Sequence, residues 1–224
     1  MLRCLLMPDC VVCGIEAGDP ICAGCERDYF PRGTVRCAIC AERLPASENG
    51  SLALCGRCLA HAPHFDATIA GADYAPPVDG MILALKFQAR LDLGHAFGRL
   101  LAARAPKVAI DAVVPVPLSR LRLRERGFNQ VEEIARSLAR ELGRPCLRFA
   151  LQRIAERPPQ QGLSLARRRA NVRHAFVAPS ALCLGHVVLV DDVMTSGSTL
   201  DEAAACLKRA GVGKVTNMVA ARTP

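Results

Sequence analysis

The chain has 224 residues, which suits one core domain with a small additional domain, and its formal net charge at pH 7 is +8. It contains no run of about 18 apolar residues, so a membrane-spanning helix is not predicted. The apolar part of its N-terminus is too short for a secretory signal, and we expect a cytoplasmic protein.

The positive charge is concentrated between residues 119 and 173. This band holds 14 arginines, no lysine and five acids, a net charge of +9, so the rest of the chain sums to −1. Such a band favours polyanions, either nucleotide phosphates or nucleic acid, although a solvated helix surface would have the same composition. With 2 Tyr, 7 Phe and no Trp, a platform for stacking single-stranded bases is poorly supported.

Cysteine is the most unusual component. Of 12 cysteines, eight form four CxxC pairs within the first 58 residues. Two intervening residues let both thiolates of a tight turn face one ion, and two such turns complete a tetrahedral shell of four sulfurs. Residues 1–64 contain little from which to build a hydrophobic core, so they need a cross-link such as a bound metal ion in order to fold. The predicted ligands are Cys10, Cys13, Cys22, Cys25, Cys37, Cys40, Cys55 and Cys58.

These pairs predict two structural zinc sites. The simplest pairing is serial, with the first two pairs in one site and the last two in the other, and an interleaved pairing is the alternative that the spacing leaves open. Disulfides or a redox pair are alternatives that four regularly repeated pairs in a cytoplasmic protein argue against. If the zinc is structural, chelation is expected to unfold residues 1–64 and to leave residues 65–224 folded.

The next elements predict the start of an α/β domain. Phe65–Tyr74 is typical of an entering strand and marks the domain boundary. The prolines that follow predict the start of a helix at Val78–Phe87, and Leu91–Arg104 predicts a second amphipathic helix. Lys86, close to the end of the first helix, is a candidate phosphate contact; a solvated helix end is the alternative.

A second strand leads into the arginine-rich band. Asp111–Leu118 (DAVVPVPL) predicts a buried strand, and the alternating arginines of Ser119–Gly127 are well placed to meet a pyrophosphate at its end. Phe128–Leu142 predicts a helix that Gly143 ends, and a short strand is predicted at Leu147–Leu151.

The long polar stretch Arg157–Phe176 contains glycine and proline. It predicts a lid that orders over a bound ligand, with an exposed loop and a basic helix as the alternative. Near the end of the chain, Lys214–Ala220 predicts the final strand of the sheet.

The rest of the chain is organised around residues 185–208. Val187–Val190 predicts a strand buried on both faces of a parallel sheet, and Asp191 and Asp192 follow where this strand should end. A loop of small and hydroxyl residues then opens an Ala-rich helix, and Thr199 with Glu202 has the spacing of a capping box.

This order of strand, acid pair, loop and helix is suited to a phosphorylated sugar. Ligands of open α/β sheets bind beyond the carboxyl ends of the strands. The loop offers backbone N–H groups, hydroxyl donors and the positive end of a helix dipole to a phosphate. The two carboxylates are able to accept hydrogen bonds from a vicinal diol and to hold a hydrated Mg²⁺. A plain strand–turn–helix, with acids and hydroxyls that only cap the helix, is the alternative.

The sequence VVLVDDVMTSGST resembles the phosphoribosyl-pyrophosphate (PRPP) signature of type I phosphoribosyltransferases. The resemblance implies that Asp191 and Asp192 contact the ribose hydroxyls. It also implies that the loop cradles the 5′-phosphate. The loop residues are Thr195, Ser196, Gly197, Ser198 and Thr199.

Three further features resemble the ComF/GntX family, bacterial proteins linked to natural competence and use of external DNA. They are the leading cysteine pairs, the stretch VPVPLSRLRLRERGFNQ, and a pattern of Gln, Leu, Arg, Asn and Ala-Phe between 160 and 176. The resemblance implies a pyrophosphate loop and a set of further phosphate or lid residues. The pyrophosphate loop is Pro117, Leu118, Ser119 and Arg120, and the further candidates are Lys86, Arg126, Asn129, Gln130, Gln160, Arg168 and Asn171.

We therefore expect an α/β type I phosphoribosyltransferase fold, mostly parallel, at residues 65–224, behind a double zinc ribbon at residues 1–64. One functional hypothesis is an enzyme that binds PRPP with Mg²⁺ and transfers phosphoribose to an acceptor. The other is a non-catalytic protein that senses PRPP or a nucleotide. In that case the ribbon and the arginine band would bind single-stranded DNA or a competence or DNA-processing partner.

Overall fold

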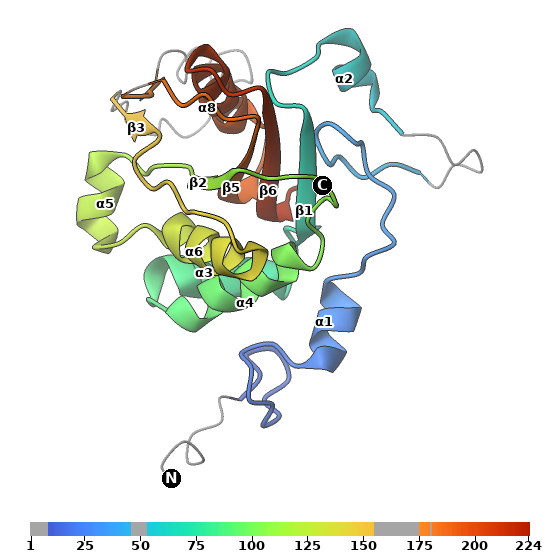
Figure 1. Ribbon diagram of the computed structural model, residues 1–224. Coiled ribbons are helices and arrows are strands. Elements are labelled where there is room, and N and C mark those ends of the chain that lie inside the picture. Colours follow the sequence, from blue (N-terminus) through green and yellow to red (C-terminus); the bar gives the residue numbers. More distant parts are fainter. Residues whose placement is uncertain (1–8, 46–52, 155–174, 180) are drawn as a thin grey trace.

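The computed structural model describes residues 9–45, 53–154, 175–179 and 181–224. Its centre is a four-stranded parallel sheet with the strand order β1-β6-β5-β2 (Figure 1). The strands are β1 (Ala67–Asp73), β2 (Ala112–Pro115), β5 (His186–Met194) and β6 (Lys214–Arg222). The strands predicted within Phe65–Tyr74, Asp111–Leu118 and Lys214–Ala220 are thus confirmed as β1, β2 and β6.

Helices cover both faces of this sheet. One face carries α3 (Val78–Phe87), α4 (Leu91–Ala102) and α6 (Gln130–Leu142), and the other carries α8 (Ser198–Arg209) (Figure 1). Successive side chains of a strand point to opposite faces, so Val188 and Val190 of β5 pack against the first group of helices, and Val187 and Leu189 pack beside α8. The continuous apolar run of β5 is therefore explained by burial on both sides.

Two predicted boundaries are wrong. Strand β5 does not end before Asp191 but continues through both acids to Met194, because its ladder with β6 persists to the pair Met194–Arg222. The strand predicted around Leu147–Leu151 does not form at these residues: Cys146 makes one isolated bridge to Val113, the chain then turns, and a strand follows only at Gln152–Arg153.

Three short elements complete the carboxyl end of the sheet. The arginine-rich stretch after β2 forms α5 (Arg120–Arg126), which the alternating arginines did not predict. Strands β3 (Gln152–Arg153) and β4 (Phe176–Val177) pair in an antiparallel ladder. Most of the predicted lid, residues 157–174, lies outside the described residues.

The cysteine-rich segment forms two small ribbons that pack on opposite sides of the sheet. The first ribbon, residues 9–30, contains α1 (Ala23–Tyr29) and lies against α4. The ring centroids of Phe30 and Phe97 are 6.2 Å apart there. The second ribbon, residues 35–45 and 53–61, contains α2 (Gly56–Ala60) (Figure 1). Its cysteines share a buried cluster with Phe65 and Met194. No helix within the described ranges is long and apolar enough to cross a bilayer.

Candidate active site and metal centres

The two acids of β5 point in different directions. Asp192 lies on the same side of the strand as Val188 and Val190, towards α3 and α6, whereas Asp191 alternates to the side of α8. Asp192 is buried, and Asp191 is partly exposed. The strand therefore leaves one carboxylate partly accessible to solvent and buries the other among the neighbouring helices.

Both oxygens of Asp192 have partners. Lys86, at the end of α3, places its Nζ 3.0 Å from one oxygen, and Gln130, at the start of α6, donates from Nε2 to the other at 2.5 Å. The side-chain oxygen of Gln130 is buried and has no hydrogen-bond partner among the described residues. The structure thus brings together three residues that the sequence proposed separately as site residues.

Asp191 sits where its negative charge is disfavoured. Its Oδ1 accepts the backbone N–H of Asp192 at 2.9 Å. Burial, reinforced by the charge of Asp192, raises the pKa of Asp191 to about 7, and the opposing effects of Lys86 and Arg153 are smaller. A carboxyl group with this pKa changes its charge in the physiological range.

Arg153 is a candidate site residue that the sequence analysis missed. It lies on β3 with its guanidinium carbon 5.6 Å from the centroid of Phe176 on β4, and burial lowers its pKa. Its Nε is buried without a partner among the residues that the structure describes. The two-residue strand carries no motif, and only the packing of β3 against β4 reveals this arginine beside Asp191.

The loop after β5 has the form expected of a phosphate cradle. Ser196 and Ser198 place their hydroxyl oxygens 2.9 Å apart, and the backbone N–H of Ser198 also approaches Ser196 Oγ at 3.4 Å. Thr195 is exposed. The loop therefore ends with hydroxyl groups at the N-terminus of a helix of 12 residues.

The predicted capping box is wrong. Helix α8 begins at Ser198, with Gly197 as its N-cap, so Thr199 lies inside the first turn. Gly197 has φ +80°, and a Cβ there would lie 2.6 Å from the terminal methyl of Met194. Only glycine fits this left-handed turn without displacing the methionine.

The predicted pyrophosphate loop follows β2 at the same end of the sheet. Pro117, Leu118 and Ser119 are partly exposed, and Arg120 is exposed. Ser119 caps α5 by accepting the backbone N–H of Arg122 at 3.3 Å. The loop therefore leads directly into α5 and its arginines.

Asn129 has a structural role in this structure. Its side-chain oxygen accepts the backbone N–H of Val131 and caps α6, and its Nδ2 donates to the carbonyl of Val116 at 3.3 Å. The side chain is buried and thereby ties α6 to the end of β2. Both polar atoms are therefore engaged within the protein, and the role of Asn129 as a ligand contact stays a prediction.

A cavity of about 460 Å³ opens between α3 and α5. Arg126 lies over the ring of Phe87 at 4.9 Å to the centroid, and its Nη1 is buried without a partner in the described part of the chain. Burial lowers the pKa of Arg126, and the charge of Asp192 opposes that effect. The lining residues are Leu83, Lys86, Phe87, Arg122, Glu125 and Arg126.

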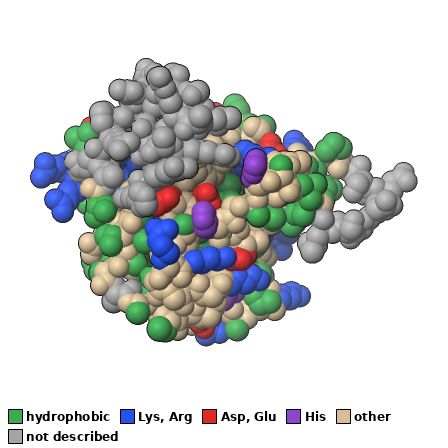
Figure 2. Space-filling view, turned by 90° about the horizontal axis from the view of Figure 1, so that it is seen from above, with side chains coloured by type: hydrophobic (Ala, Val, Ile, Leu, Met, Phe, Trp, Pro, Cys, Tyr) green, Lys and Arg blue, Asp and Glu red, His purple; other side chains and the backbone are tan. Residues whose placement is uncertain are grey.

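Figure 2 shows acidic side chains beside lysine or arginine side chains on the face seen from above. Three of the predicted site residues, Gln160, Arg168 and Asn171, fall outside the described residues.

The eight cysteines of the CxxC pairs form two tetrads in the serial arrangement. In each tetrad the four Sγ atoms lie within 4.8 Å of one another, and close pairs are Cys13–Cys22 at 3.7 Å and Cys40–Cys55 at 3.6 Å. Four sulfurs about 2.3 Å from a tetrahedral zinc are about 3.8 Å apart, whereas a disulfide needs about 2.05 Å. The donor set and its spacing therefore fit zinc.

One thiol in each tetrad has a pKa below the usual value for cysteine. Burial alone would raise the pKa of Cys10, but backbone N–H donors outweigh it and lower the pKa to about 6. The same competition lowers the pKa of Cys37 to about 7. Burial raises the pKa of Cys25 and Cys58. A bound zinc ion would stabilise all four thiolates of a tetrad and supply structural cross-linking there.

The comparisons with known proteins agree with this arrangement. The family model of the phosphoribosyl transferase domain matches residues 105–224, more than half of the chain, and the chain belongs to this family. Competence protein F of Haemophilus influenzae is 32% identical over 211 residues, covering 89% of each chain. DNA utilization protein YhgH of Escherichia coli K12 is 36% identical over 210 residues, covering 91% of this chain and 90% of that protein. The predicted resemblance to ComF proteins is confirmed.

Among solved structures, glutamine PRPP amidotransferase from B. subtilis aligns with a TM-score of 0.42 and 22% identity. The alignment covers 62% of this chain and 30% of that one. The family assignment rests on the domain match and on the relatives above. The sheet, its helices and the two cysteine tetrads accordingly form a type I phosphoribosyltransferase fold with features of an N-terminal zinc ribbon pair.

Proposed function

We propose that this chain binds PRPP with Mg²⁺ at the carboxyl ends of β2 and β5 and transfers its phosphoribosyl group to an acceptor. One observation carries the proposal. The partly exposed carboxylate of Asp191 and a hydroxyl-rich loop at a helix N-terminus follow each other at the end of β5, and Lys86, which lines the cavity between α3 and α5, pairs with the adjacent Asp192. These groups suit a ligand that carries a phosphate, a diol and a pyrophosphate.

Each group then has a role in the reaction. Asp191 accepts hydrogen bonds from the ribose hydroxyls, and the loop from Thr195 to Thr199 holds the 5′-phosphate. The bond between the anomeric carbon and pyrophosphate breaks with its electron pair leaving on pyrophosphate, and the lone pair of the acceptor forms the new bond. The loop from Pro117 to Arg120 and the arginine Arg126 stabilise the charge on the leaving group.

Two metal roles accompany this proposal. Asp191 offers the oxygen ligands that Mg²⁺ prefers, and Mg²⁺ would neutralise charge on the pyrophosphate. The tetrads would hold zinc in a structural role, because all four ligands come from the protein and leave no open position. From the names of the relatives we further propose a role in competence or DNA utilisation.

The test is calorimetric titration of PRPP into the intact protein with and without Mg²⁺. We expect Mg²⁺-dependent binding that the Asp191→Asn/Asp192→Asn double variant loses by at least about 100-fold, since each lost charge-assisted contact contributes about 1.5–3 kcal/mol. Screening acceptors for pyrophosphate release then separates catalysis from binding. Wild-type protein that does not bind PRPP would contradict the proposal.

A binding role is the second candidate, and one observation favours it. Arg120, Arg122 and Arg124 are exposed on the short helix α5, within the basic band. Exposed arginines on one element suit contacts with the phosphates of single-stranded DNA or with an acidic partner from the DNA-processing machinery. If the wild-type protein does not bind PRPP, this candidate takes precedence.

The pKa of Asp191 gives the PRPP site a predicted pH dependence. Because the raised pKa of about 7 keeps this carboxyl protonated in acid, PRPP affinity should increase up to tenfold per pH unit as pH rises towards 7 and level off above about 8.

The same raised pKa affects the stability of the free protein. The free energy of unfolding should fall as pH rises from about 4 to about 7, since the native state retains a proton that the unfolded chain has released.

The measurement is calorimetry between pH 5.5 and 8.5. The Asp191→Asn variant is the control, because it retains the titration of the ligand's own phosphates and removes that of the carboxyl group. Equal pH profiles for the two proteins would contradict the assignment of the titration to Asp191.

A further inference from the structure

The base of the phosphate loop is held by the C-terminal end of β6. Met194 is the last residue of β5 and directly precedes the loop. Its carbonyl oxygen accepts the backbone N–H of Thr223 at 3.0 Å, and Arg222 Nη1 and Thr223 Oγ1 each approach it at 3.4 Å. Its side chain is 1% exposed and lies under Gly197. The position of Met194 therefore sets the position of the loop.

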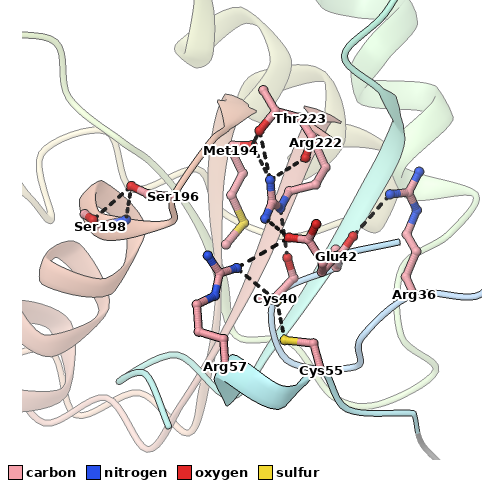
Figure 3. Close-up of polar contacts among 11 residues, drawn as sticks. Arg36, Cys40, Glu42, Cys55, Arg57, Met194, Ser196, Ser198, Arg222 and Thr223 are labelled. Carbon is pink, nitrogen blue, oxygen red and sulfur yellow. Dashed lines mark hydrogen bonds and ion pairs between the residues drawn. The ribbon is translucent and has the colours of Figure 1, made fainter. Parts of the chain in front are cut away.

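The other end of Arg222 reaches the second ribbon. Its side chain is only 3% exposed, its Nε donates to the carbonyl of Cys40 at 3.2 Å, and its Nη2 pairs with Glu42. Figure 3 shows this arginine between Met194 and the ribbon. A buried guanidinium with all of these partners fixes the ribbon and the strand end relative to each other.

Arg57 connects the same acid to the metal-ligating sulfurs. It lies on α2, and its Nη2 is 3.5 Å from both Glu42 Oε2 and Cys40 Sγ (Figure 3). A continuous series of contacts therefore runs from the second tetrad through Arg57, Glu42 and Arg222 to Met194. The side chain of Met194 also packs in the buried cluster that contains Cys40 and Cys58.

The second ribbon also forms one wall of a hollow at the loop itself. This hollow has a volume of about 50 Å³, and its lining includes Arg57 and His61 from the ribbon, Ser196, Gly197 and Ser198 from the loop, and Asp201 from α8. The second ribbon is therefore in direct contact with the loop region as well as connected to it through Met194.

The first ribbon makes its contacts elsewhere. Asp19 pairs with Arg99 of α4 at 3.2 Å, and Arg104 donates to the carbonyl of Phe30. These contacts lie on the face that carries α3, α4 and α6. The two tetrads are alike in ligands but different in what they touch, which makes the first an internal control for the second.

We propose that the second cysteine tetrad, through Arg57, Glu42 and Arg222, positions the phosphate loop and thereby sets its affinity for the 5′-phosphate of a sugar. The proposal rests on the proposed PRPP site. Arg57 and Arg222 are positioning residues here, since they act on the loop through Met194. Ligands that use only the pyrophosphate end of the site should not depend on this series of contacts.

The experiment compares matched variants of the full chain. Cys55→Ser and Cys13→Ser each remove the more accessible cysteine of one tetrad. Arg57→Gln leaves the second tetrad complete, and Arg27→Gln is its control at an arginine of the first ribbon whose side chain is 79% exposed. For each protein we would measure zinc per chain, hydrogen exchange of residues 194–199 without ligand, and affinity for ribose 5-phosphate and for pyrophosphate.

We expect Cys55→Ser and Arg57→Gln to accelerate exchange in 194–199 and to weaken ribose 5-phosphate binding by roughly 3- to 30-fold, with pyrophosphate affinity unchanged. The Arg57→Gln variant should show the faster exchange and the weaker ribose 5-phosphate binding while two zinc ions are still bound. Cys13→Ser and Arg27→Gln should leave both readouts at the wild-type value.

Two results would overturn the proposal: equal effects of the matched cysteine variants, or parallel losses for ribose 5-phosphate and pyrophosphate, which indicate general destabilisation. If the wild-type protein binds neither ligand, the proposed function fails, and the exchange of residues 194–199 alone decides this inference. Unchanged exchange in Cys55→Ser and Arg57→Gln would then reject it.

Discussion

Removal of zinc from the intact protein is expected to unfold both ribbons and to lower the melting temperature of the phosphoribosyltransferase domain as well. The ribbons are short, and their buried residues are largely the cysteines themselves. Zinc binding to comparable four-ligand peptides contributes about 10–16 kcal/mol at pH 7, and this binding energy is folding energy. The remaining contacts of segments this small do not replace it.

The effect on the larger domain follows from shared buried contacts. Ile21 and Phe30 of the first ribbon belong to the same buried cluster as the helices on that face of the sheet. In the second ribbon, Arg36 pairs with Asp73 of β1 at 2.6 Å, and Glu42 pairs with the buried Arg222 of β6. Unfolding the ribbons exposes the first surface to water and deprives Arg222 of a charged partner.

Calorimetric melting before and after complete chelation, with metal content measured on the same samples, checks this prediction. We expect the main transition to fall by more than 10 °C, since about 1 kcal/mol shifts a domain of 150–250 residues by about 2–4 °C. Restoring zinc should restore the transition. An unchanged transition in metal-free protein would mean that residues 65–224 fold as an independent unit, as the sequence alone suggested.

The sequence predicted correctly those features whose residues all lie within one short segment of the chain. The run from Val187 to Thr199 carries strand, acids, loop and helix start in one stretch, and local patterns are enough to order such a unit. The CxxC spacing similarly predicts a metal turn without any tertiary information. Both predictions concern residues that are neighbours in the chain.

What the sequence did not reveal depends on contacts between distant segments. Arg222 and Glu42 are 180 residues apart, and nothing in either local pattern indicates that they meet. Whether Asp191 or Asp192 faces a ligand depends on which helices cover each face of the sheet. The capping error at Thr199 has a similar origin, because the requirement for glycine at position 197 comes from the packing of Met194 beneath it.

The charge on Lys86 is expected to be essential for the fold of the site as well as for its ligand. Lys86 and Asp192 have side chains only 17% and 8% exposed, and their charged atoms are 3.0 Å apart. The Lys86→Met variant leaves the carboxylate buried with Gln130 as its remaining side-chain partner. Removing one member of a buried ion pair costs about 3–5 kcal/mol, chiefly because the other charge is then uncompensated.

Urea denaturation of two single variants and one double variant separates this pairing from other effects. Lys86→Met should lower the free energy of unfolding by about 3–5 kcal/mol, and Lys86→Met/Asp192→Asn should recover most of that loss because no charge is left unpaired. Lys107→Met, at an exposed lysine, should change stability by less than about 0.5 kcal/mol. If the double variant is no more stable than Lys86→Met, the loss comes from packing of the lysine stem and not from the charge of Asp192. In that case Asp192 tolerates its buried position without Lys86, and the division of roles between the two acids of β5 would have to be abandoned.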